Sequence, residues 1–299
     1  MTNESVEGGA LDGTVTWGAL LAETEVLLAR SSAMENPRQE AKWIVEEATG
    51  TAGADFADVL ASLATVRGVS HLDSMVERRV AGEPVQYVLG RWPFRTLDLL
   101  VDRRVLIPRP ETEVVAGLAI DELGNLRPGG GGTVVDLGTG SGAIGLAIAV
   151  ECSAARVLLT DASADALTVT RANLAGLGVA ARGVEISEGS WFDAIPERYL
   201  GECDVIVSNP PYVRTIDDLP DSVADWEPSM ALLAGEDGLD DLRLIVDRAG
   251  LFLRGAGSLV LEMDASQTLV VAEMCRDAGF SASIHQDLAG IDRAVVARR

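Results

Sequence analysis

The sequence predicts an α/β protein with a Rossmann-like, doubly wound parallel sheet, preceded by a small helical domain and a connecting β-hairpin. From residue 133 onward, short apolar runs alternate with stretches of helical periodicity, which is the pattern of a parallel sheet covered by helices. A glycine-rich turn over residues 138–142 joins the first of these runs to a helix. Residues 1–85 show helical periodicity instead. The chain has 299 residues, 47% of them hydrophobic, so it can bury the core that such a fold needs.

Residues 1–85 are predicted to form the helical domain. The stretch Asn36-Pro37-Arg38-Gln39 starts a helix, because it combines an N-cap, a proline at the first helical position and a capping-box glutamine. This helix is expected to end at Gly50. His71 would lie in the first turn of another helix, where we expect a surface residue rather than a ligand. The remaining predicted helices cover residues 16–30, 55–66 and 70–82.

Residues 86–107 are predicted to form the β-hairpin, since apolar and charged residues interleave along this stretch. The chain then passes through Leu106-Ile107-Pro108-Arg109-Pro110-Glu111-Thr112-Glu113. We expect this segment to act as a hinge, because each proline restricts both itself and the residue before it. A helix is expected to follow and to end near Pro128 and the glycines at 129–132.

Residues 108–299 are predicted to form the third part of the chain, which contains the sheet. Its helices are expected near residues 142–151, 164–176, 239–254 and 265–278. Its strands are expected near residues 133–137, 156–160, 183–187, 203–208, 257–263, 281–286 and 292–298.

The charge of the chain limits the partners that it can have. The formal net charge is −22, from 24 basic and 46 acidic residues. Such a surface repels phosphate backbones, so we expect no direct binding of nucleic acid. A protein partner that is itself associated with nucleic acid remains compatible with this charge.

The cysteines and the N-terminus indicate the cellular compartment in which the protein is expected. Cys152, Cys203 and Cys275 are odd in number and far apart, which argues against a disulfide framework and favours a reducing environment. With two histidines in the chain, no metal site is expected. The N-terminus lacks the features of a signal peptide, and no apolar stretch approaches the roughly 20 residues of a membrane span. We therefore expect a soluble cytoplasmic protein, a monomer without membrane contact.

The tetrapeptide Asn209-Pro210-Pro211-Tyr212 follows the apolar run at 204–208, which is typical of a buried parallel strand. Open α/β sheets bind ligands at the carboxyl ends of their strands. The two prolines remove two backbone donors and leave carbonyl oxygens free to accept hydrogen bonds. Together with the Asn209 amide and the Tyr212 ring, they predict a site for a planar –NH2 group. A strand-ending turn without such a role is the alternative.

The glycine turn predicts a cofactor site. Glycines allow the backbone to turn sharply and a ligand to approach it closely. Residues 140–145, Gly-Ser-Gly-Ala-Ile-Gly, also match the dinucleotide fingerprint, which alone is a weak signal. Asp136 favours S-adenosylmethionine over NAD, because enzymes that bind S-adenosylmethionine commonly carry an acid just before these glycines.

Asp161 ends the next predicted strand, where its carboxylate can accept both ribose hydroxyls of either cofactor. A cationic sulfonium and an ammonium group favour acidic surroundings, whereas a pyrophosphate prefers a helix N-terminus and basic residues. This contrast again favours S-adenosylmethionine. A tight packing turn without a ligand is the alternative for the glycines, and a helix cap is the alternative for Asp161.

Together these residues resemble the class I, seven-stranded methyltransferases, and within them the glutamine methyltransferases that modify peptide-chain release factors. The resemblance covers nearly the whole chain in order, and the linker at 106–113 favours this subfamily over related enzymes that methylate a ribosomal protein. The chain departs from the family pattern at Glu262-Met263-Asp264, where packing beside the active site is expected to differ. The other matching stretches are Gly82–Tyr87, Gly90–Phe94, Trp191-Phe192, Asn209–Tyr212, Glu227-Pro228 and Ala289–Arg293.

The resemblance implies methyl transfer from S-adenosylmethionine to the glutamine amide nitrogen of a Gly-Gly-Gln motif, in support of translation termination. The Asn209 side-chain oxygen and the Pro210 carbonyl would accept the amide hydrogens, Tyr212 would pack on the amide plane, and Pro211 would complete the pocket. The helical domain and the hairpin would grip the protein substrate. The residues implied to contact the cofactor are Gly138, Thr139, Gly140, Ser141, Gly142, Asp161, Trp191 and Asn209; core packing is the alternative for Trp191.

Other functions stay open. A nucleic-acid methyltransferase that acts on an exocyclic base amine would use the same Asn-Pro-Pro-Tyr chemistry, although a flipped base needs a basic approach surface. A ribosomal-protein glutamine is a second possible acceptor. A cofactor-binding adaptor without catalytic activity is a rival of another class, and retention of both the glycine turn and Asn209 argues against it.

Overall fold

The structure, a computed structural model, describes residues 12–30, 36–217 and 219–299. The chain divides into two compact units, Met1–Gly90 and Arg91–Arg299. The first unit is mainly helical and buries its own core, to which Leu28, Ile44, Leu72 and Met75 contribute. Its elements are α1 (Trp17–Leu28), α2 (Pro37–Thr49), α3 (Phe56–Leu60), α4 (Val66–Val80) and α5 (Val85–Leu89), with the antiparallel strands β1 (Asp12–Thr16) and β2 (Leu63–Thr65).

The start and end of α2 confirm the sequence prediction. The Asn36 side-chain oxygen accepts a hydrogen bond from the Gln39 amide at 3.2 Å, as an N-cap does. The helix ends at Gly50, which adopts a left-handed conformation with a φ of 66°. Local side-chain chemistry therefore fixes both ends of this helix.

Two helix predictions in this unit are wrong in extent. The helix predicted over residues 55–66 ends at Leu60, and Leu63–Thr65 form β2. Helix α4 begins at Val66 rather than at residue 70, because the Thr65 hydroxyl caps it by accepting a hydrogen bond from the Gly68 amide at 3.1 Å. His71 consequently lies in the second turn of α4, and it is exposed as predicted.

The predicted hairpin is wrong at both ends. Its strands are β3 (Arg91–Phe94) and β4 (Leu97–Leu100), paired antiparallel within the second unit. Residues 86–89 belong instead to α5, which ends at Gly90 in the left-handed conformation. After Leu100, the Asp102 carboxylate accepts a hydrogen bond from the Arg104 amide and forms a local turn in place of a strand.

The second unit contains a seven-stranded sheet of order β10-β11-β9-β8-β5-β6-β7. The strands are β5 (Thr133–Leu137), β6 (Arg156–Asp161), β7 (Val184–Glu188), β8 (Cys203–Ser208), β9 (Leu253–Glu262), β10 (Ser281–Gln286) and β11 (Asp292–Arg298). The pairs that include β11 are antiparallel, and the other pairs are parallel. Every predicted strand is confirmed, with β9 beginning at residue 253 instead of 257.

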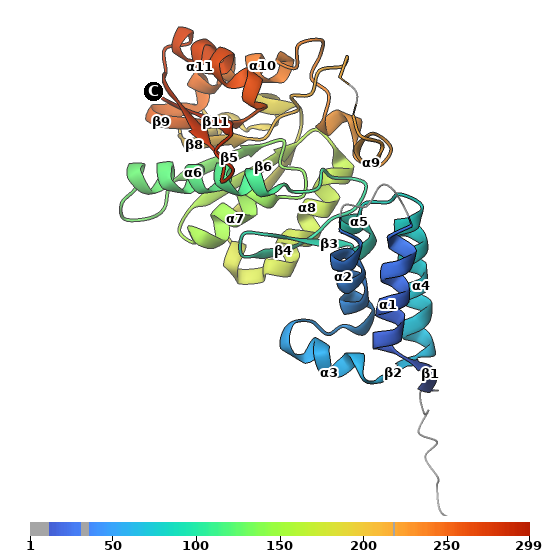
Figure 1. Ribbon diagram of the computed structural model, residues 1–299. Helices are drawn as coiled ribbons and strands as arrows, with labels where there is room; N and C mark the ends of the chain where they lie inside the picture. The colour runs from blue at the N-terminus through green and yellow to red at the C-terminus, as the bar shows by residue number, and fades with distance from the viewer. Residues whose placement is uncertain (1–11, 31–35, 218) are drawn as a thin grey trace, which may run out of the picture. The chain divides into compact units, whose positions relative to one another are not determined.

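Helices cover both faces of this sheet (Figure 1). They are α6 (Pro110–Leu126), α7 (Ala143–Glu151), α8 (Ala164–Leu177), α10 (Asp240–Phe252) and α11 (Thr268–Asp277), and the predicted helices of the sheet domain are confirmed. The short helix α9 (Asp221–Ala224) buries none of its residues. The segment predicted as a hinge is already helical from Pro110 onward. Single 3-10 turns lie at Gly53–Asp55, Gly178–Ala181, Trp191–Ala194, Glu197–Tyr199, Ser229–Ala231 and Ala265–Gln267. None of the helices in the described ranges combines the length and hydropathy that crossing a bilayer would need.

Side chains that alternate along the strands contribute to two hydrophobic cores, one on each face of the sheet. Successive residues of a strand point to opposite faces of the sheet. Val134 packs in a cluster with residues of α6 and α7, whereas Val135 packs in a cluster with residues of α10 and α11. Figure 1 shows these two helix pairs on opposite sides of the sheet.

The parallel strands β5, β6, β7 and β8 end at the same edge of the sheet. The residues that follow them are Gly138, Ala162, Gly189 and Asn209. The carboxyl edge of a parallel sheet is where open α/β folds bind their ligands. The topology thus brings the glycine turn, the end of β6 and the Asn-Pro-Pro-Tyr segment to one place.

Candidate active site

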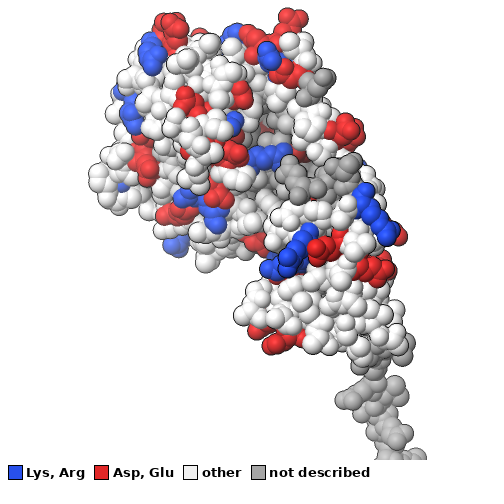
Figure 2. All heavy atoms as spheres, in the orientation of Figure 1, with Lys and Arg blue, Asp and Glu red and all other residues white. Residues whose placement is uncertain are grey.

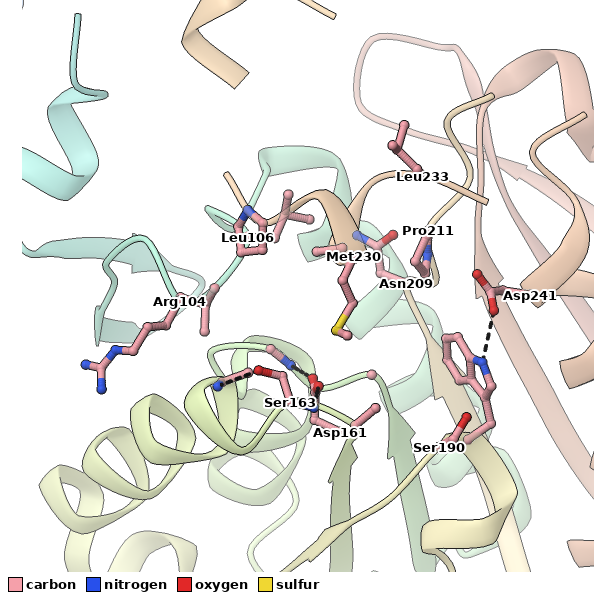
Figure 3. Close-up of a pocket in the computed structure, with 18 of the residues that line it drawn as sticks. Arg104, Leu106, Asp161, Ser163, Ser190, Asn209, Pro211, Met230, Leu233 and Asp241 are labelled. Carbon is pink, nitrogen blue, oxygen red and sulfur yellow. Dashed lines mark hydrogen bonds between the residues drawn. The ribbon is translucent and has the colours of Figure 1, made fainter. Parts of the chain in front are cut away.

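A cavity of about 390 Å³ opens at this edge, and Figure 3 shows the residues that line it. Of the residues predicted as a site from the sequence, it brings together Gly138, Gly140, Asp161, Trp191, Asn209 and Pro211. The predicted residues Thr139, Ser141, Gly142, Pro210 and Tyr212 lie outside its lining. The lining residues that were not predicted as site residues from the sequence are Arg104, Val105, Leu106, Ala162, Ser163, Ala166, Gly189, Ser190, Pro228, Met230, Ala231, Leu233 and Asp241.

The glycine turn has a conformation that requires its glycines. Gly138, Gly140 and Gly142 have φ angles of 69°, 57° and 88°, in the left-handed region that other residues rarely adopt. Gly138 and Gly140 present bare backbone to the cavity. Thr139 and Ser141 are buried, so they build the turn rather than the cavity wall.

Asp136 holds the glycine turn in place by hydrogen bonds. Its Oδ2 accepts hydrogen bonds from the Thr139 hydroxyl at 2.6 Å and from the Gly145 amide at 3.0 Å. Burial raises the pKa of Asp136 to about 6, and these two donors oppose the shift. Its Oδ1 has no hydrogen-bond partner among the described residues. The acid that favoured S-adenosylmethionine in the sequence therefore shapes the backbone of the turn and does not line the cavity.

Asp161 faces the cavity from the end of β6. Its Oδ2 accepts a hydrogen bond from the Gly140 amide at 2.9 Å, and its Oδ1 accepts one from the Ser163 amide at 2.8 Å. Each carboxylate oxygen can accept a further hydrogen bond, so these contacts leave room for ligand hydroxyls. Burial raises the pKa of Asp161. The cap-like contact with Ser163 and a ligand contact are thus compatible.

Trp191 is held in an unusual backbone conformation against the glycine turn. Its φ is 45°, which is rare for a residue other than glycine. Its indole Nε1 donates a hydrogen bond at 3.0 Å to Asp241 in the first turn of α10, drawn as a dashed line in Figure 3. Part of the ring packs on the neighbouring core, and Trp191 also lines the cavity. Backbone strain of this kind gathers at functional sites, and here the Asp241 contact holds it in place.

The Asn-Pro-Pro-Tyr segment divides between two cavities. Asn209 and Pro211 line the first cavity, and Pro210 between them is buried. The Asn209 Nδ2 donates a hydrogen bond to the Thr112 hydroxyl at 3.3 Å. Tyr212 lines a second cavity of about 410 Å³, and its backbone oxygen accepts a hydrogen bond from Gln267 at 3.0 Å. Burial raises the pKa of the Tyr212 phenol.

Another part of the wall of the first cavity comes from two segments that the Glu227 carboxylate holds together. Leu106 belongs to the linker, and Met230 follows the Glu227-Pro228 pair (Figure 3). The buried Glu227 pairs with Arg109 and accepts a hydrogen bond from the Ile107 amide at 3.1 Å. The sequence marked Glu227-Pro228 as a matching stretch, yet no local pattern indicated that its carboxylate reaches the linker.

The chemistry of the lining fits S-adenosylmethionine better than a dinucleotide. Asp161 and Asp241 put two carboxylates at the cavity, and burial raises the pKa of both, so a nearby cation would be favoured. Trp191, Leu106 and Met230 provide apolar surface. Arg104 is the one basic residue among the described lining residues, and Asp102 already pairs with it. A pyrophosphate would therefore meet little free positive charge.

Two family models match the chain. The model of the methyltransferase small domain matches residues 120–224, and the model of the PrmC N-terminal domain matches residues 19–90. The release factor glutamine methyltransferase of Agrobacterium fabrum (strain C58) is 35% identical over 97% of this chain and 99% of its own length. The enzyme of the same description from Moorella thermoacetica is 37% identical over 93% of this chain and 90% of its own.

Solved structures agree on the fold. The hMettl16 catalytic domain, in complex with a hairpin of the MAT2A 3′UTR, superposes with a TM-score of 0.53 at 15% sequence identity. The match covers 77% of this chain and 79% of that one. At this identity the likeness concerns the methyltransferase fold alone.

Proposed function

The chain belongs to the family of release factor glutamine methyltransferases, and from this premise we propose that it methylates the side-chain amide nitrogen of a glutamine in a peptide-chain release factor. S-adenosylmethionine is the methyl donor of this reaction. The glutamine would be that of the Gly-Gly-Gln motif, so that the enzyme supports translation termination.

One observation carries the proposal. A single cavity is lined on one side by the glycine turn and Asp161, and on the other by Asn209 and Pro211. The first group suits a nucleoside with an amino-acid tail, and the second offers hydrogen-bond acceptors to an –NH2 group. A methyl donor and an amide acceptor can therefore meet within one cavity, where positioning supplies much of the rate.

We propose that the cofactor is held by residues of the first group. Gly138 and Gly140 offer bare backbone to its amino-acid part, Asp161 accepts from the ribose hydroxyls, and the Trp191 ring lies beside the adenine. Thr139, Ser141 and Gly142 support this arrangement by holding the turn. Bound there, S-adenosylmethionine supplies an electrophilic methyl group on a cationic sulfur.

The Asn209 side-chain oxygen and the Pro210 carbonyl are proposed to activate the glutamine. An amide nitrogen is a poor nucleophile because its lone pair is delocalised into the carbonyl. Two acceptors that bind its two hydrogens orient the nitrogen and stabilise the positive charge that develops on it during attack. The methylated nitrogen then loses a proton to water. Pro211 and Tyr212 would complete the acceptor side, with Tyr212 reaching the glutamine from the second cavity.

The charge distribution argues against a base amine as the acceptor. On the face in Figure 2, basic side chains lie singly or in small groups beside acidic ones. Several of the arginines are paired with a carboxylate, as Arg127 is with Asp204 and Arg298 is with Glu122. A flipped base needs an approach surface with free positive charge. The net charge of −22 points the same way.

We also propose that the enzyme acts in the cytoplasm as a monomer, and that the helical unit grips the protein substrate. Cys152, Cys203 and Cys275 are all free thiols, which is compatible with a reducing compartment. Burial raises the pKa of Cys203 and Cys275 to about 12, so these two are inert structural residues.

The test is to incubate the protein with labelled S-adenosylmethionine and a release factor that contains Gly-Gly-Gln, and to map the label by peptide mass spectrometry. We expect one methyl group on that glutamine. A release factor with this glutamine replaced by alanine should take up no label. Label on RNA or DNA, or on a ribosomal protein, with none on the glutamine, would reject the proposed substrate.

A further inference from the structure

A buried carboxylate lies directly behind the proposed acceptor residue. The parallel register pairs Ser208 of β8 with Leu261 of β9, so the next residues along the two strands, Asn209 and Glu262, are neighbours at the sheet edge. Glu262 is only 1% exposed. Its Oε2 has no partner within hydrogen-bonding distance among the described residues. A buried carboxylate without full hydrogen bonding is costly, which calls for a reason for its presence.

The surroundings of Glu262 connect it to Asn209 in two ways. The Thr112 hydroxyl and the Asn209 amide lie near its carboxyl group, and the donor character of both lowers the pKa of Glu262. The Asn209 Nδ2 also donates to the Thr112 hydroxyl oxygen at 3.3 Å. The three side chains come from β9, from the first turn of α6 and from the segment after β8. Glu262 and Thr112 are buried, and Asn209 lies between them and the cavity.

We propose that Glu262 and Thr112 are positioning residues that fix the orientation of the Asn209 amide, so that its oxygen is turned toward the glutamine. This inference rests on the proposed function, in which Asn209 must accept a hydrogen bond. The two ends of an asparagine amide have nearly the same shape, so packing alone cannot choose between them. An ionised carboxylate only accepts hydrogen bonds, and it therefore draws the –NH2 end of Asn209 to itself. A flipped Asn209 would present a donor to a substrate –NH2 group that also donates.

The ionisation of Glu262 should control how firmly the Asn209 amide is held in this orientation. Burial raises the pKa of Glu262 to about 7, and the Thr112 donor and the charge of Arg293 on β11 oppose the shift. The charge of Glu111 on α6 raises the pKa of Glu262 further, and the charge of Glu262 in turn raises the pKa of the partly buried Tyr212 phenol. As the pH falls through about 7, the carboxyl group takes up a proton and becomes a donor as well. Its preference for the –NH2 end of Asn209 is then lost.

The first test compares Thr112→Val, Thr112→Ser and Glu262→Gln. Thr112→Val keeps the shape but removes the hydroxyl, and Glu262→Gln keeps the shape but adds a donor. In both variants we expect kcat for release factor methylation to fall by roughly 10- to 100-fold, with unchanged affinity for S-adenosylmethionine. Thr112→Ser restores the hydroxyl and should recover most of the turnover that Thr112→Val loses.

Glu122→Gln is the matched control. Glu122 is a buried carboxylate that is bonded to Ser258 and Arg298 away from the cavity. The kcat of this variant should equal that of the wild type.

A second readout does not need methylation. The side-chain amide resonances of Asn209, assigned by their loss in Asn209→Ala, should move with pH around a midpoint of about 7 in the wild type. In Glu262→Gln this titration should be absent. Wild-type kcat in Glu262→Gln and Thr112→Val, or an Asn209 amide that does not sense Glu262, would overturn the inference. If the wild type leaves the release factor glutamine unmethylated while the Asn209 amide still titrates, the proposed function fails and the positioning role stands.

Discussion

The indole ring of Trp191 lies against Gly138, so close that a Cβ atom at residue 138 would be 3.4 Å from the ring carbon Cζ3. Gly138 also has a φ of 69°. The backbone conformation thus favours glycine here, on the wall of the cavity where we propose that the methyl donor binds, and a Cβ atom at residue 138 would be in van der Waals contact with the ring.

Replacement of Gly138 by alanine should weaken binding of S-adenosylmethionine about 10-fold or more, because a residue other than glycine at this φ strains the turn that lines the cavity by about 1–3 kcal/mol. Calorimetric titration measures the affinity. Gly201→Ala is the control, since Gly201 has a φ of 65° and open space around its Cβ position. It should lose similar stability and bind the cofactor normally. Equal affinity in the two variants would remove Gly138 from the binding site.

Replacement of Asn209 by alanine should lower kcat by about 100-fold or more, the usual cost of removing a group that stabilises transition-state charge. The affinity for S-adenosylmethionine should change little, because the cofactor is held mainly by residues on the opposite wall. Single-turnover methylation of a release factor measures the loss. Asn125→Ala, an exposed change on α6, should retain full activity. An Asn209→Ala enzyme with wild-type turnover would contradict the clamp mechanism.

Replacement of Glu227 by glutamine should release the linker from the far wall of the cavity. Glu227 pairs with Arg109 and accepts from the Ile107 amide, so its neutral isostere holds Leu106 less firmly. We expect stability to fall by about 1–3 kcal/mol and cofactor affinity to fall several-fold. Asp204→Asn is matched to it, because Asp204 is buried, pairs with Arg127 and accepts from the Thr133 amide outside the cavity. Thermal unfolding should show a similar loss for both, and calorimetry should show weaker cofactor binding for Glu227→Gln alone.

Replacement of Glu262 by glutamine should stabilise the protein at neutral pH. Burial raises the folded-state pKa of Glu262 from an ordinary 4.5 to about 7. As the pH rises from about 4.5 through 7, Glu262 ionises in the unfolded chain before it ionises in the folded protein. The wild type therefore loses stability over this range, and the total loss in the free energy of unfolding is roughly 3 kcal/mol. The variant lacks this loss. Denaturant unfolding at several pH values should show a difference that is near zero below pH 4.5 and greatest above pH 7. A variant that is less stable than the wild type at pH 8 would contradict this account.

Short-range patterns were sufficient to predict the parts of the fold that local sequence determines. Apolar runs such as 133–137 and 203–208 are strands, and Asn36 and Gly50 bound α2 as expected. The helix start at Val66 was missed because its cap, Thr65, lies at the end of a three-residue strand that resembles helical periodicity.

The site was predictable where a residue ends a strand, as Asp161 does, or follows one directly, as Asn209 does. Residues that reach the site from elsewhere were not. Thr112 contacts Asn209 across 97 positions of sequence, and Trp191 contacts Asp241 across 50. Nothing near Thr112 or Asp241 in the sequence marks such a partner, because these contacts arise only when strands distant in sequence become neighbours in the sheet.

The place of β11 in the sheet has a consequence for biosynthesis. This strand, residues 292–298, lies between β10 and β9 rather than at an edge. A growing chain can pair β9 with β8 as soon as both have left the ribosome, but the other side of β9 stays open until residue 292 and its successors emerge. Arg293 of the same strand supplies a positive charge near Glu262. Assembly of the site around Asn209 therefore waits for residues 292–298. A chain interrupted shortly before residue 292 would expose an apolar strand edge and carry an unfinished acceptor site.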